Sequence, residues 1–444
     1  MSPPIAALTV RGMSTPSTHK RHVAIAGGGV AGIELALALR ALAGTTIDLT
    51  LVAPDDELRY RPLAVVEPFG RPAPRRYPLD AICRDLDIAR VRDELSEVDV
   101  AAHAIATKGG ERIAYDDLAI AIGARPRPAL PRAHTFLADT DADSLHWLVS
   151  EVEQGWIKRV AFVVPAATGW SLPLYELALM TAARARAAGI DDLALTLVTP
   201  EDVPLAAFRG AGSDAVAALL DEAGIAVLPS TYVRDYDGRR LELAPLSRSH
   251  PVDRVVALPA LVGPAIAGLP CDAEGFVHVD EHGRVPGAPD VFAIGDATTF
   301  PIKQGGVASQ EADVAAALIA RAAGLDVSVP RSRPLLRAVM LTGDEPLYLR
   351  ATIAGGESFS SSASRHCPWW PPHKIAARHL APYLADREET DSATARRHAL
   401  AAKLGGEATA IHADGDATGI ELLGRDACVQ RRPAPADLTD GRGV

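Results

Sequence analysis

The 444-residue chain has few aromatic residues, few cysteines and no long apolar run. Phe, Tyr and Trp make up 5% of the sequence, and the four cysteines lie too far apart for the C-x-x-C spacing of a zinc cluster or a local redox dithiol. No stretch reaches the ~18 consecutive apolar residues that a membrane-spanning helix needs. These absences argue against a local metal site and a transmembrane protein. The cysteine usage favours a reducing, cytoplasmic setting.

The first 20 residues and the net charge of the chain disfavour two further classes of protein. Residues 1–20 lack a basic start followed by a sustained apolar segment, so no secretory signal is expected, and Met13 is an alternative start to Met1. The formal net charge of −11 disfavours nucleic-acid binding, which depends on Lys and Arg neutralising phosphates. A hydrophobic content of 48% is typical of a globular protein, and the length predicts two or three domains.

A glycine-rich turn follows the first apolar segment. From residue 22 the sequence HVAIAGGGVAGIELALALRALAG predicts a buried strand, a tight turn and a helix, and TIDLTLVAP predicts a second, parallel strand. Gly27, Gly29 and Gly32 occupy the G-x-G-x-x-G positions, where glycine turns the chain, admits a diphosphate and lets the helix pack on the strand. With Val30 and Ala31, they are predicted to bind a dinucleotide diphosphate at the helix N-terminus.

The second strand departs from the usual dinucleotide pattern at its end. An acidic residue that binds ribose hydroxyls commonly stands there, whereas this strand runs into Ala53, which is predicted to be a cofactor-binding residue. Asp55, Asp56 or Glu57 could take the ribose role from the next turn. A solvated turn without a binding role is the alternative.

The strand-turn-helix order recurs near residue 159, in RVAFVVPAATGWSLPLYELALM, and DLALTLVTPEDVP predicts the strand that follows. The repetition predicts a duplicated fold. Of a second glycine fingerprint only Gly169 remains. Trp170, Pro173 and Tyr175 are bulky or rigid where a diphosphate needs bare backbone, so tight NAD(P)H binding is disfavoured.

These patterns predict an α/β fold. It comprises two nested Rossmann-like, doubly wound dinucleotide-binding domains with parallel sheets, and a C-terminal α+β cap. The expected boundaries are 21–150 and 271–330 for the first domain, 151–270 for the second, 331–390 for the cap, and 391–444 for a polar tail or small appendage.

Three motifs together resemble one superfamily. GGGVAG near the start, AIGARP around Gly123 and VFAIGDAT around Gly295 are similar to the FAD/NAD(P)-binding pyridine nucleotide-disulfide oxidoreductases. Over residues 21–383 the chain resembles the branch that contains sulfide:quinone reductases, flavocytochrome c sulfide dehydrogenases and type II NADH dehydrogenases. The resemblance implies FAD as the cofactor.

The resemblance also implies roles for residues around the flavin. Asp296 would hydrogen-bond the ribitol, Gly295 and Gly123 would let backbone approach closely, and Arg61 lies in the segment that runs along FAD. An exposed arginine in a proline-rich loop is the alternative for Arg61.

A helix expected to begin near Val307, with Gly306 in the backbone cradle before it, would point its N-terminus at the flavin pyrimidine edge. Lys303 would then stabilise negative charge on the reduced flavin. An ordinary surface lysine is the alternative.

The C-terminal part offers one candidate redox sulfur. Sulfide chemistry in that branch uses two sulfurs beside the flavin, and Cys367 is the only cysteine in a matching place, with an unpaired buried thiol as the alternative. Trp369 and Trp370 precede a prolyl turn and an amphipathic helix. We interpret this segment as a cap over the flavin, ahead of an interfacial membrane foot or dimer packing.

The leading hypothesis is an FAD-dependent oxidoreductase. It would pass electrons from a small reductant through flavin to an acceptor such as a quinone or disulfide. An NAD(P)H dehydrogenase of the type II-like class and a non-catalytic flavin-binding scaffold or sensor are the alternatives. The expected partners are a small-molecule donor and acceptor. Nucleic acid is not expected as a partner, and peripheral membrane contact and a homodimer stay open.

Overall fold

The computed structural model describes residues 20–70, 75–137, 142–166, 168–245, 248–330, 334–352 and 359–389. Contacts divide the chain into one unit that ends at Asp386 and another that begins at Arg387. All the elements named below belong to the first unit. The tail expected at 391–444 and the cysteine Cys428 lie outside the described residues.

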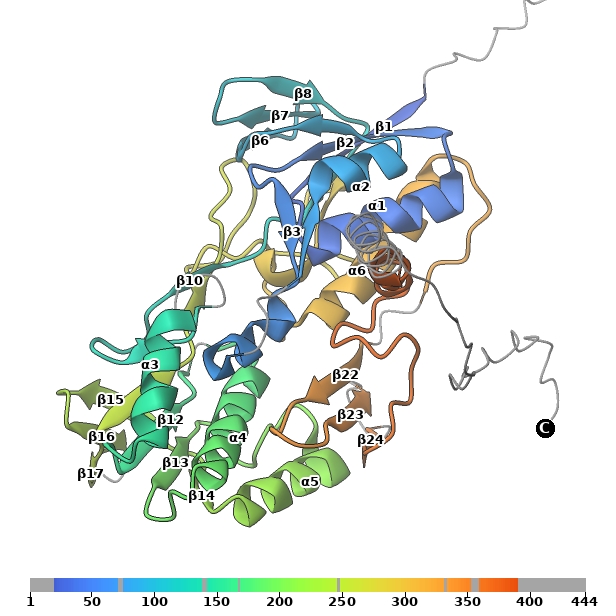
Figure 1. Cartoon of the computed structure of the whole chain (residues 1–444). Coiled ribbons are helices and arrows are strands. Elements are labelled where there is room, and N and C mark those ends of the chain that lie inside the picture. Colours follow the sequence, from blue (N-terminus) through green and yellow to red (C-terminus); the bar gives the residue numbers. More distant parts are fainter. Residues whose placement is uncertain are drawn as a thin grey trace, which may run out of the picture. The chain divides into compact units, whose positions relative to one another are not determined.

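The helices and strands of the first unit are shown in Figure 1. The helices are α1 (Val30–Ala43), η1 (Arg61–Phe69), α2 (Leu79–Asp85), α3 (Ala142–Glu153), α4 (Leu172–Ala187), α5 (Arg209–Glu222), η2 (Gly295–Ala297) and α6 (Gly305–Ala322). The strands are β1 (Arg21–Ala26), β2 (Ile47–Val52), β3 (Glu57–Arg59), β4 (Arg76–Pro78), β5 (Ala89–Val91), β6 (Leu95–Asp99), β7 (Ala104–Thr107), β8 (Arg112–Ala114), β9 (Asp117–Ile120), β10 (Arg125–Arg127), β11 (His134–Thr135), β12 (Arg159–Val163), β13 (Ala194–Val198), β14 (Ile225–Leu228), β15 (Tyr232–Tyr236), β16 (Arg240–Ala244), β17 (Arg248–Pro251), β18 (Arg254–Ala257), β19 (Ala260–Val262), β20 (Arg284–Val285), β21 (Ala288–Ala293), β22 (Leu335–Met340), β23 (Leu347–Thr352) and β24 (Ser361–Ser364).

The first sheet has the order β20-β21-β9-β1-β2-β5, and only β20 runs antiparallel to its neighbour. The β1 segment HVAIA is buried from Val23 to Ala26, as expected of a parallel strand covered on both faces. Helices α1 and α6 pack closely against each other on one face. The strand order reverses between β1 and β9, and such a switch point places a ligand crevice at the carboxyl ends of the strands.

The second sheet has the order β11-β18-β12-β13-β14 and is parallel throughout. Its order reverses between β12 and β18, which repeats the arrangement of the first sheet. The two sheets confirm the predicted α/β class with two Rossmann-like halves. The short antiparallel pair of β10 and β19 connects the halves, and β11 at residue 134 already belongs to the second sheet.

The residues from 335 onward contact both halves of the fold. Strands β22, β23 and β24 form an antiparallel sheet that contacts α5 and α6. The next segment reaches α1, where the buried carboxylate of Glu34 accepts hydrogen bonds from the backbone N–H groups of His379 (2.9 Å) and Leu380 (2.5 Å). Burial raises the pKa of Glu34 to about 7.

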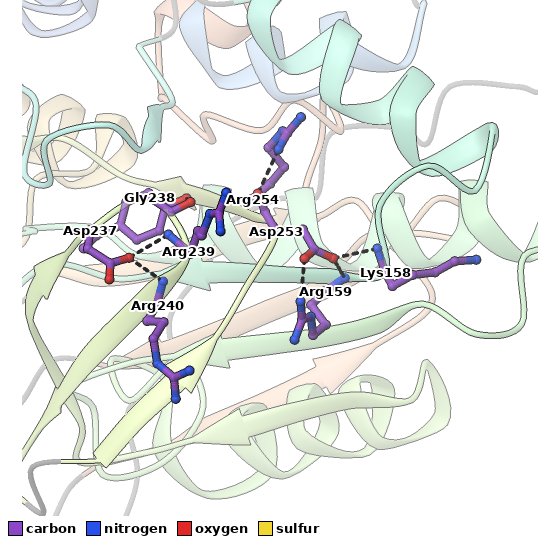
Figure 2. A network of polar contacts seen from close by, with 9 residues as sticks. Lys158, Arg159, Asp237, Gly238, Arg239, Arg240, Asp253 and Arg254 are labelled. Atoms are coloured by element: carbon purple, nitrogen blue, oxygen red, sulfur yellow. Dashed lines mark hydrogen bonds and ion pairs between the residues drawn. The ribbon is translucent and has the colours of Figure 1, made fainter.

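A polar network anchors the amino ends of β12 and β18 (Figure 2). Asp253 accepts hydrogen bonds from the backbone N–H groups of Lys158 and Arg159, both at 2.9 Å, and from the Arg159 guanidinium at 2.7 Å. Asp237 accepts from the backbone of the following turn in the same way. The network lies at the amino ends of the second sheet's strands, and a switch-point crevice would lie at their carboxyl ends. We therefore assign the network a structural role.

Within the described ranges no helix is both long enough and apolar enough to cross a membrane. Nor do three His, Cys, Asp or Glu side chains in these ranges gather as ligands for a metal ion.

Candidate functional site

A cavity of about 390 Å³ opens at the carboxyl ends of the first sheet, where its strand order reverses. We call it the switch-point cavity. Its volume is within the range of small-molecule sites. Its lining includes Gly27, Gly29, Val30, Ala31, Asp55, Glu57, Arg61, Gly123, Gly295, Asp296, Gly305, Ala308 and Ile375.

The three fingerprint glycines have different surroundings. Gly27 has φ +114°, and a Cβ there would lie 2.3 Å from the carbonyl oxygen of Ala121. A Cβ on Gly32 would lie 2.0 Å from the carbonyl oxygen of Gly27, so Gly32 lets α1 pack on the turn. A Cβ on Gly29 would meet no protein atom within 4 Å, and Gly29 lines the cavity. These surroundings match the three roles that the fingerprint predicts.

The N-terminus of α1 is open toward the switch-point cavity. Gly29 is the N-cap residue and provides no side chain to bond the first backbone N–H groups, and the first turn has no acidic residue. Those N–H groups carry the positive end of the helix dipole, which attracts a diphosphate. The open direction at Gly29 leaves room for it, so the residues fit a dinucleotide.

The turn after β2 supplies the acidic residues that the strand itself lacks. Asp55 and Glu57 line the cavity. Asp56 lies elsewhere and pairs with Arg90 at 3.5 Å and Arg92 at 3.8 Å. Of the three candidates, Asp55 and Glu57 are therefore the ones that line the cavity.

Asp296 lies at the opposite wall, in the turn η2 that follows β21. Gly295 before it has φ +70°, and a Cβ there would lie 3.2 Å from that of Ala308 and 3.4 Å from that of Ala31. Glycine thus lets the turn enter between α1 and α6. Burial raises the pKa of the Asp296 carboxyl, against the opposing effect of Lys303 and Arg61.

Lys303 lies behind Asp296, and it is not a surface lysine. Its Nζ donates a hydrogen bond to the carbonyl oxygen of Thr298 and lies 4.3 Å from the ring centroid of Phe276. Burial lowers the pKa of Lys303, and the charge of Asp296 partly offsets that effect. The ammonium group is therefore held as a partly buried positive charge beside the cavity.

Helix α6 begins two residues earlier than the sequence suggested. Gln304 is the N-cap, and its Oε1 accepts a hydrogen bond from Val307 N at 2.9 Å. Gly305 lines the cavity, whereas Gly306 and Val307 are buried behind it. A Cβ on Gly305 would lie 2.8 Å from Ile375 Cδ1, so the C-terminal segment covers the start of this helix.

The structure brings eight of the predicted residues to the cavity: Gly27, Gly29, Val30, Ala31, Arg61, Gly123, Gly295 and Asp296. Gly32, Ala53, Gly306 and Val307 are not among its lining residues. Cys367 is not among the lining residues either. Its Sγ donates to the carbonyl oxygen of Trp369 at 3.2 Å, and burial raises the pKa of the thiol. No described cysteine pairs with another, and the other two are Cys83 and Cys271.

The loop between β12 and α4 is closed by the protein itself. A Cβ on Gly169 would lie 2.2 Å from Lys303 Cγ, and Lys303 N donates to the Gly169 carbonyl at 3.1 Å. Gly169 therefore makes room for the Lys303 side chain. Trp170 packs edge-on against Phe208, with ring centroids 5.9 Å apart.

Glu201 follows β13 at the place where a dinucleotide-binding half usually presents its ribose-binding acid. Its carboxylate accepts four hydrogen bonds. The donors are the side chains of Ser171 (3.0 Å), Tyr175 (2.7 Å) and Thr199 (3.0 Å) and the backbone N–H of Ala206 (3.0 Å).

The protein has two Rossmann-like halves, and the first has a glycine-lined helix N-terminus and a buried carboxylate at its switch point. These features define a dinucleotide-binding oxidoreductase of two domains. Residues 21–316 match the family described as pyridine nucleotide-disulphide oxidoreductase. The chain belongs to this family. It is a flavin-dependent oxidoreductase, and its cofactor is FAD.

Curated relatives span much of the chain. The ferredoxin reductase component of the chlorobenzene dioxygenase from Cupriavidus sp. (strain PS12) is 32% identical over 307 residues, which is 65% of this chain and 70% of that protein. The alternative NAD(P)H-ubiquinone oxidoreductase C1 of Arabidopsis thaliana is 25% identical over 350 residues, 69% of this chain and 66% of that protein.

Solved structures share the fold. The sulfide:quinone oxidoreductase from the hyperthermophilic bacterium Aquifex aeolicus superposes with a TM-score of 0.69 at 21% identity, over 78% of this chain and 87% of that chain. Putidaredoxin reductase, in its covalent complex with putidaredoxin, has a TM-score of 0.54 at 20% identity, over 75% of this chain and 81% of that chain.

If Asp296 binds the flavin ribitol as the resemblance implies, its replacement by Ala is expected to weaken FAD retention by roughly 1–3 kcal/mol, because a hydroxyl would lose its buried acceptor. The measurement is the flavin-to-protein absorbance ratio after gel filtration. Asp296→Asn keeps an oxygen acceptor and serves as the control, with retention between those of the wild type and Asp296→Ala. Flavin occupancy of Asp296→Ala equal to that of the wild type would rule out this role.

Proposed function

We propose that the electron donor of this flavoenzyme is a small reductant other than NAD(P)H, and that the acceptor is a quinone or a disulfide. The observation that carries the proposal is the hydrogen bonding of Glu201. A carboxylate offers about four lone-pair sites. All four positions are used by the protein, so a nucleotide ribose would have to displace donors that are already in place.

The diphosphate position of the second half supports the same proposal. A nicotinamide dinucleotide needs bare backbone at the loop between β12 and α4, and Gly169 there is covered by the Lys303 side chain. Tyr175 is wholly buried, and besides donating to Glu201 its hydroxyl accepts a hydrogen bond from Leu205 N at 3.0 Å. Opening the loop would therefore break a packed and fully bonded cluster.

The first half is arranged to bind FAD and to stabilise added negative charge. The N-terminus of α1 would hold the diphosphate, Asp55 or Glu57 the ribose, and Asp296 the ribitol. Bound FAD supplies an acceptor for two electrons. Lys303 and the N-terminus of α6 provide positive potential beside the cavity, which favours the charge that arrives with those electrons.

An NAD(P)H dehydrogenase is the second candidate. A cavity of about 290 Å³ lies at the switch point of the second sheet, lined by Val163, Val164 and Pro165 at the end of β12 and by Ala260 at the start of β19. The printed names of two relatives, a ferredoxin reductase component and an NAD(P)H-ubiquinone oxidoreductase, also favour this candidate. The nucleotide would then bind without a ribose contact to Glu201.

Anaerobic stopped-flow mixing separates the two candidates. We expect NADH and NADPH to leave the flavin absorbance unchanged on the millisecond to second scale, while a member of a panel of sulfide, dithiols and quinols reduces it. Dithionite serves as the control that the flavin is reducible. Rapid bleaching by either nicotinamide would favour the second candidate. Reduction by dithionite alone would favour a non-catalytic flavin protein.

A further inference from the structure

Helix α6 separates two cavities. Gly305 and Ala308 line the switch-point cavity. One turn further along, Gln310, Glu311 and Val314 line a second cavity of about 340 Å³, which we call the α6 cavity. The proposed function gives no role to the α6 cavity, and Glu311 is its acidic residue nearest to the FAD side.

Glu311 is bonded to the turn that carries Asp296. Its Oε2 accepts a hydrogen bond from Gly295 N at 2.6 Å. The carboxyl group thus lies directly behind the Gly295–Asp296 turn, with the switch-point cavity in front and the α6 cavity behind. A change of charge on Glu311 acts at short range on this turn, in a setting of low dielectric constant.

Charged groups surround Glu311 from several elements. Asp296 faces it from η2, and Lys303 faces it from the loop before α6. The α6 cavity adds Asp313 of the same helix and the acidic turn that contains Asp280 and Glu281, together with His282.

Among the influences on the Glu311 carboxyl, burial is the strongest. It raises the pKa of Glu311 to about 7, with the Gly295 N–H and Lys303 lowering it and Asp296 raising it. The pKa of Asp313 is also raised by burial, to about 6.

We propose that the Glu311 carboxylate binds a proton when FAD is reduced. It takes up this proton from the α6 cavity and releases it when FAD is reoxidised. The proposal rests on the proposed function. The two electrons come from the donor and the proton from bulk water that reaches the α6 cavity. An O–H bond forms on Glu311, with Oε1 as its site because Oε2 holds Gly295 N.

Electrostatics sets the direction in which flavin reduction shifts the pKa of Glu311. Electrons arriving beside Asp296 add negative charge near a carboxylate, and added negative charge raises the pKa of that carboxylate. Burial already raises the pKa of Glu311 to about 7. Just above that pH it is mainly ionised in the oxidised protein and becomes protonated in the reduced protein. At low pH it is protonated in both states, so no uptake by this group occurs there.

The test is proton uptake during anaerobic photoreduction of the holoprotein, followed with an indicator dye in weakly buffered solution from acid to alkaline pH. Glu311→Gln keeps an oxygen to accept Gly295 N but cannot ionise. We expect the wild type to take up as much as one proton more per two electrons than Glu311→Gln slightly above neutral pH, and the difference to vanish in acid. Glu281→Gln is the matched control, because this exposed residue lines the same cavity, and it should behave as the wild type does.

Equal uptake by wild type and Glu311→Gln, both loaded with flavin, overturns the proposal and leaves the proposed function intact. A wild-type chain that photoreduction cannot reduce overturns both. If Glu311→Gln fails to fold, the reduced-minus-oxidised infrared difference spectrum of the wild type decides. A new protonated-carboxyl band near neutral pH supports the proposal, and its absence overturns it.

Discussion

The variant Gly29→Asp is expected to purify as a folded, colourless protein. Asp is a favoured N-cap residue, so α1 loses nothing by the change. A Cβ at this position meets no protein atom within 4 Å, and Gly29 lines the switch-point cavity. There the carboxylate would occupy and repel the diphosphate. The measurements are the flavin absorbance of the purified variant and its circular dichroism spectrum beside that of wild-type apoprotein.

A second glycine provides the matched control for that variant. Gly189 follows α4 with φ +72°, has open space around its Cβ position and does not line the switch-point cavity. Asn tolerates this backbone conformation, so Gly189→Asn should retain FAD as the wild type does. A Gly29→Asp protein that is yellow with full FAD content would show that the diphosphate lies elsewhere.

Lys374→Met is expected to destabilise the fold by about 3–5 kcal/mol, because it removes one partner of a buried ion pair. Lys374 is 8% exposed, and its Nζ lies 2.7 and 2.8 Å from the two carboxylate oxygens of Glu176, which is wholly buried. Glu176 also accepts a hydrogen bond from Leu341 N, so it joins α4, the end of β22 and the C-terminal segment. The measurement is the midpoint of thermal or urea unfolding.

Two further variants separate the cost of an unpaired charge from the loss of packing. The double variant Glu176→Gln with Lys374→Met keeps an acceptor for Leu341 N and leaves no buried charge, so it should be more stable than Lys374→Met alone. Lys158→Met removes an exposed lysine paired with Asp192 and should change stability little. Unfolding midpoints that are equal for Lys374→Met and Lys158→Met would contradict the role of the buried pair.

Local patterns predicted the first half of the fold well. The apolar strand before Gly27 and the helix after Gly29 are fixed by short-range chemistry, and the same holds for the turn at Gly295 and Asp296. Each needs glycine because backbone or helices approach closely, and that need is visible as a motif. The α/β class, the family and FAD followed from these segments together.

Local sequence patterns could not predict the contacts between segments that lie far apart in the chain. The sequence alone presents Gly169 as what remains of a glycine fingerprint. The structure shows that a side chain there would collide with Lys303, which lies far along the chain. The burial of Lys303 and the closing of the cavity by Ile375 likewise depend on how chain segments meet. For Glu311 a signal existed: an acidic residue early in an alanine-rich helix that is otherwise largely buried.

We expect one dinucleotide, FAD, to bind at the first glycine loop and the second half to bind none. The most direct measurement is the identity and amount of nucleotide released by denaturing the purified wild-type protein, resolved by chromatography and mass spectrometry. The expected result is one FAD per chain and no NAD(H) or NADP(H), even after incubation with excess nicotinamide nucleotide and gel filtration. Release of FMN, absence of flavin from a folded chain, or stoichiometric retention of a nicotinamide nucleotide would contradict it.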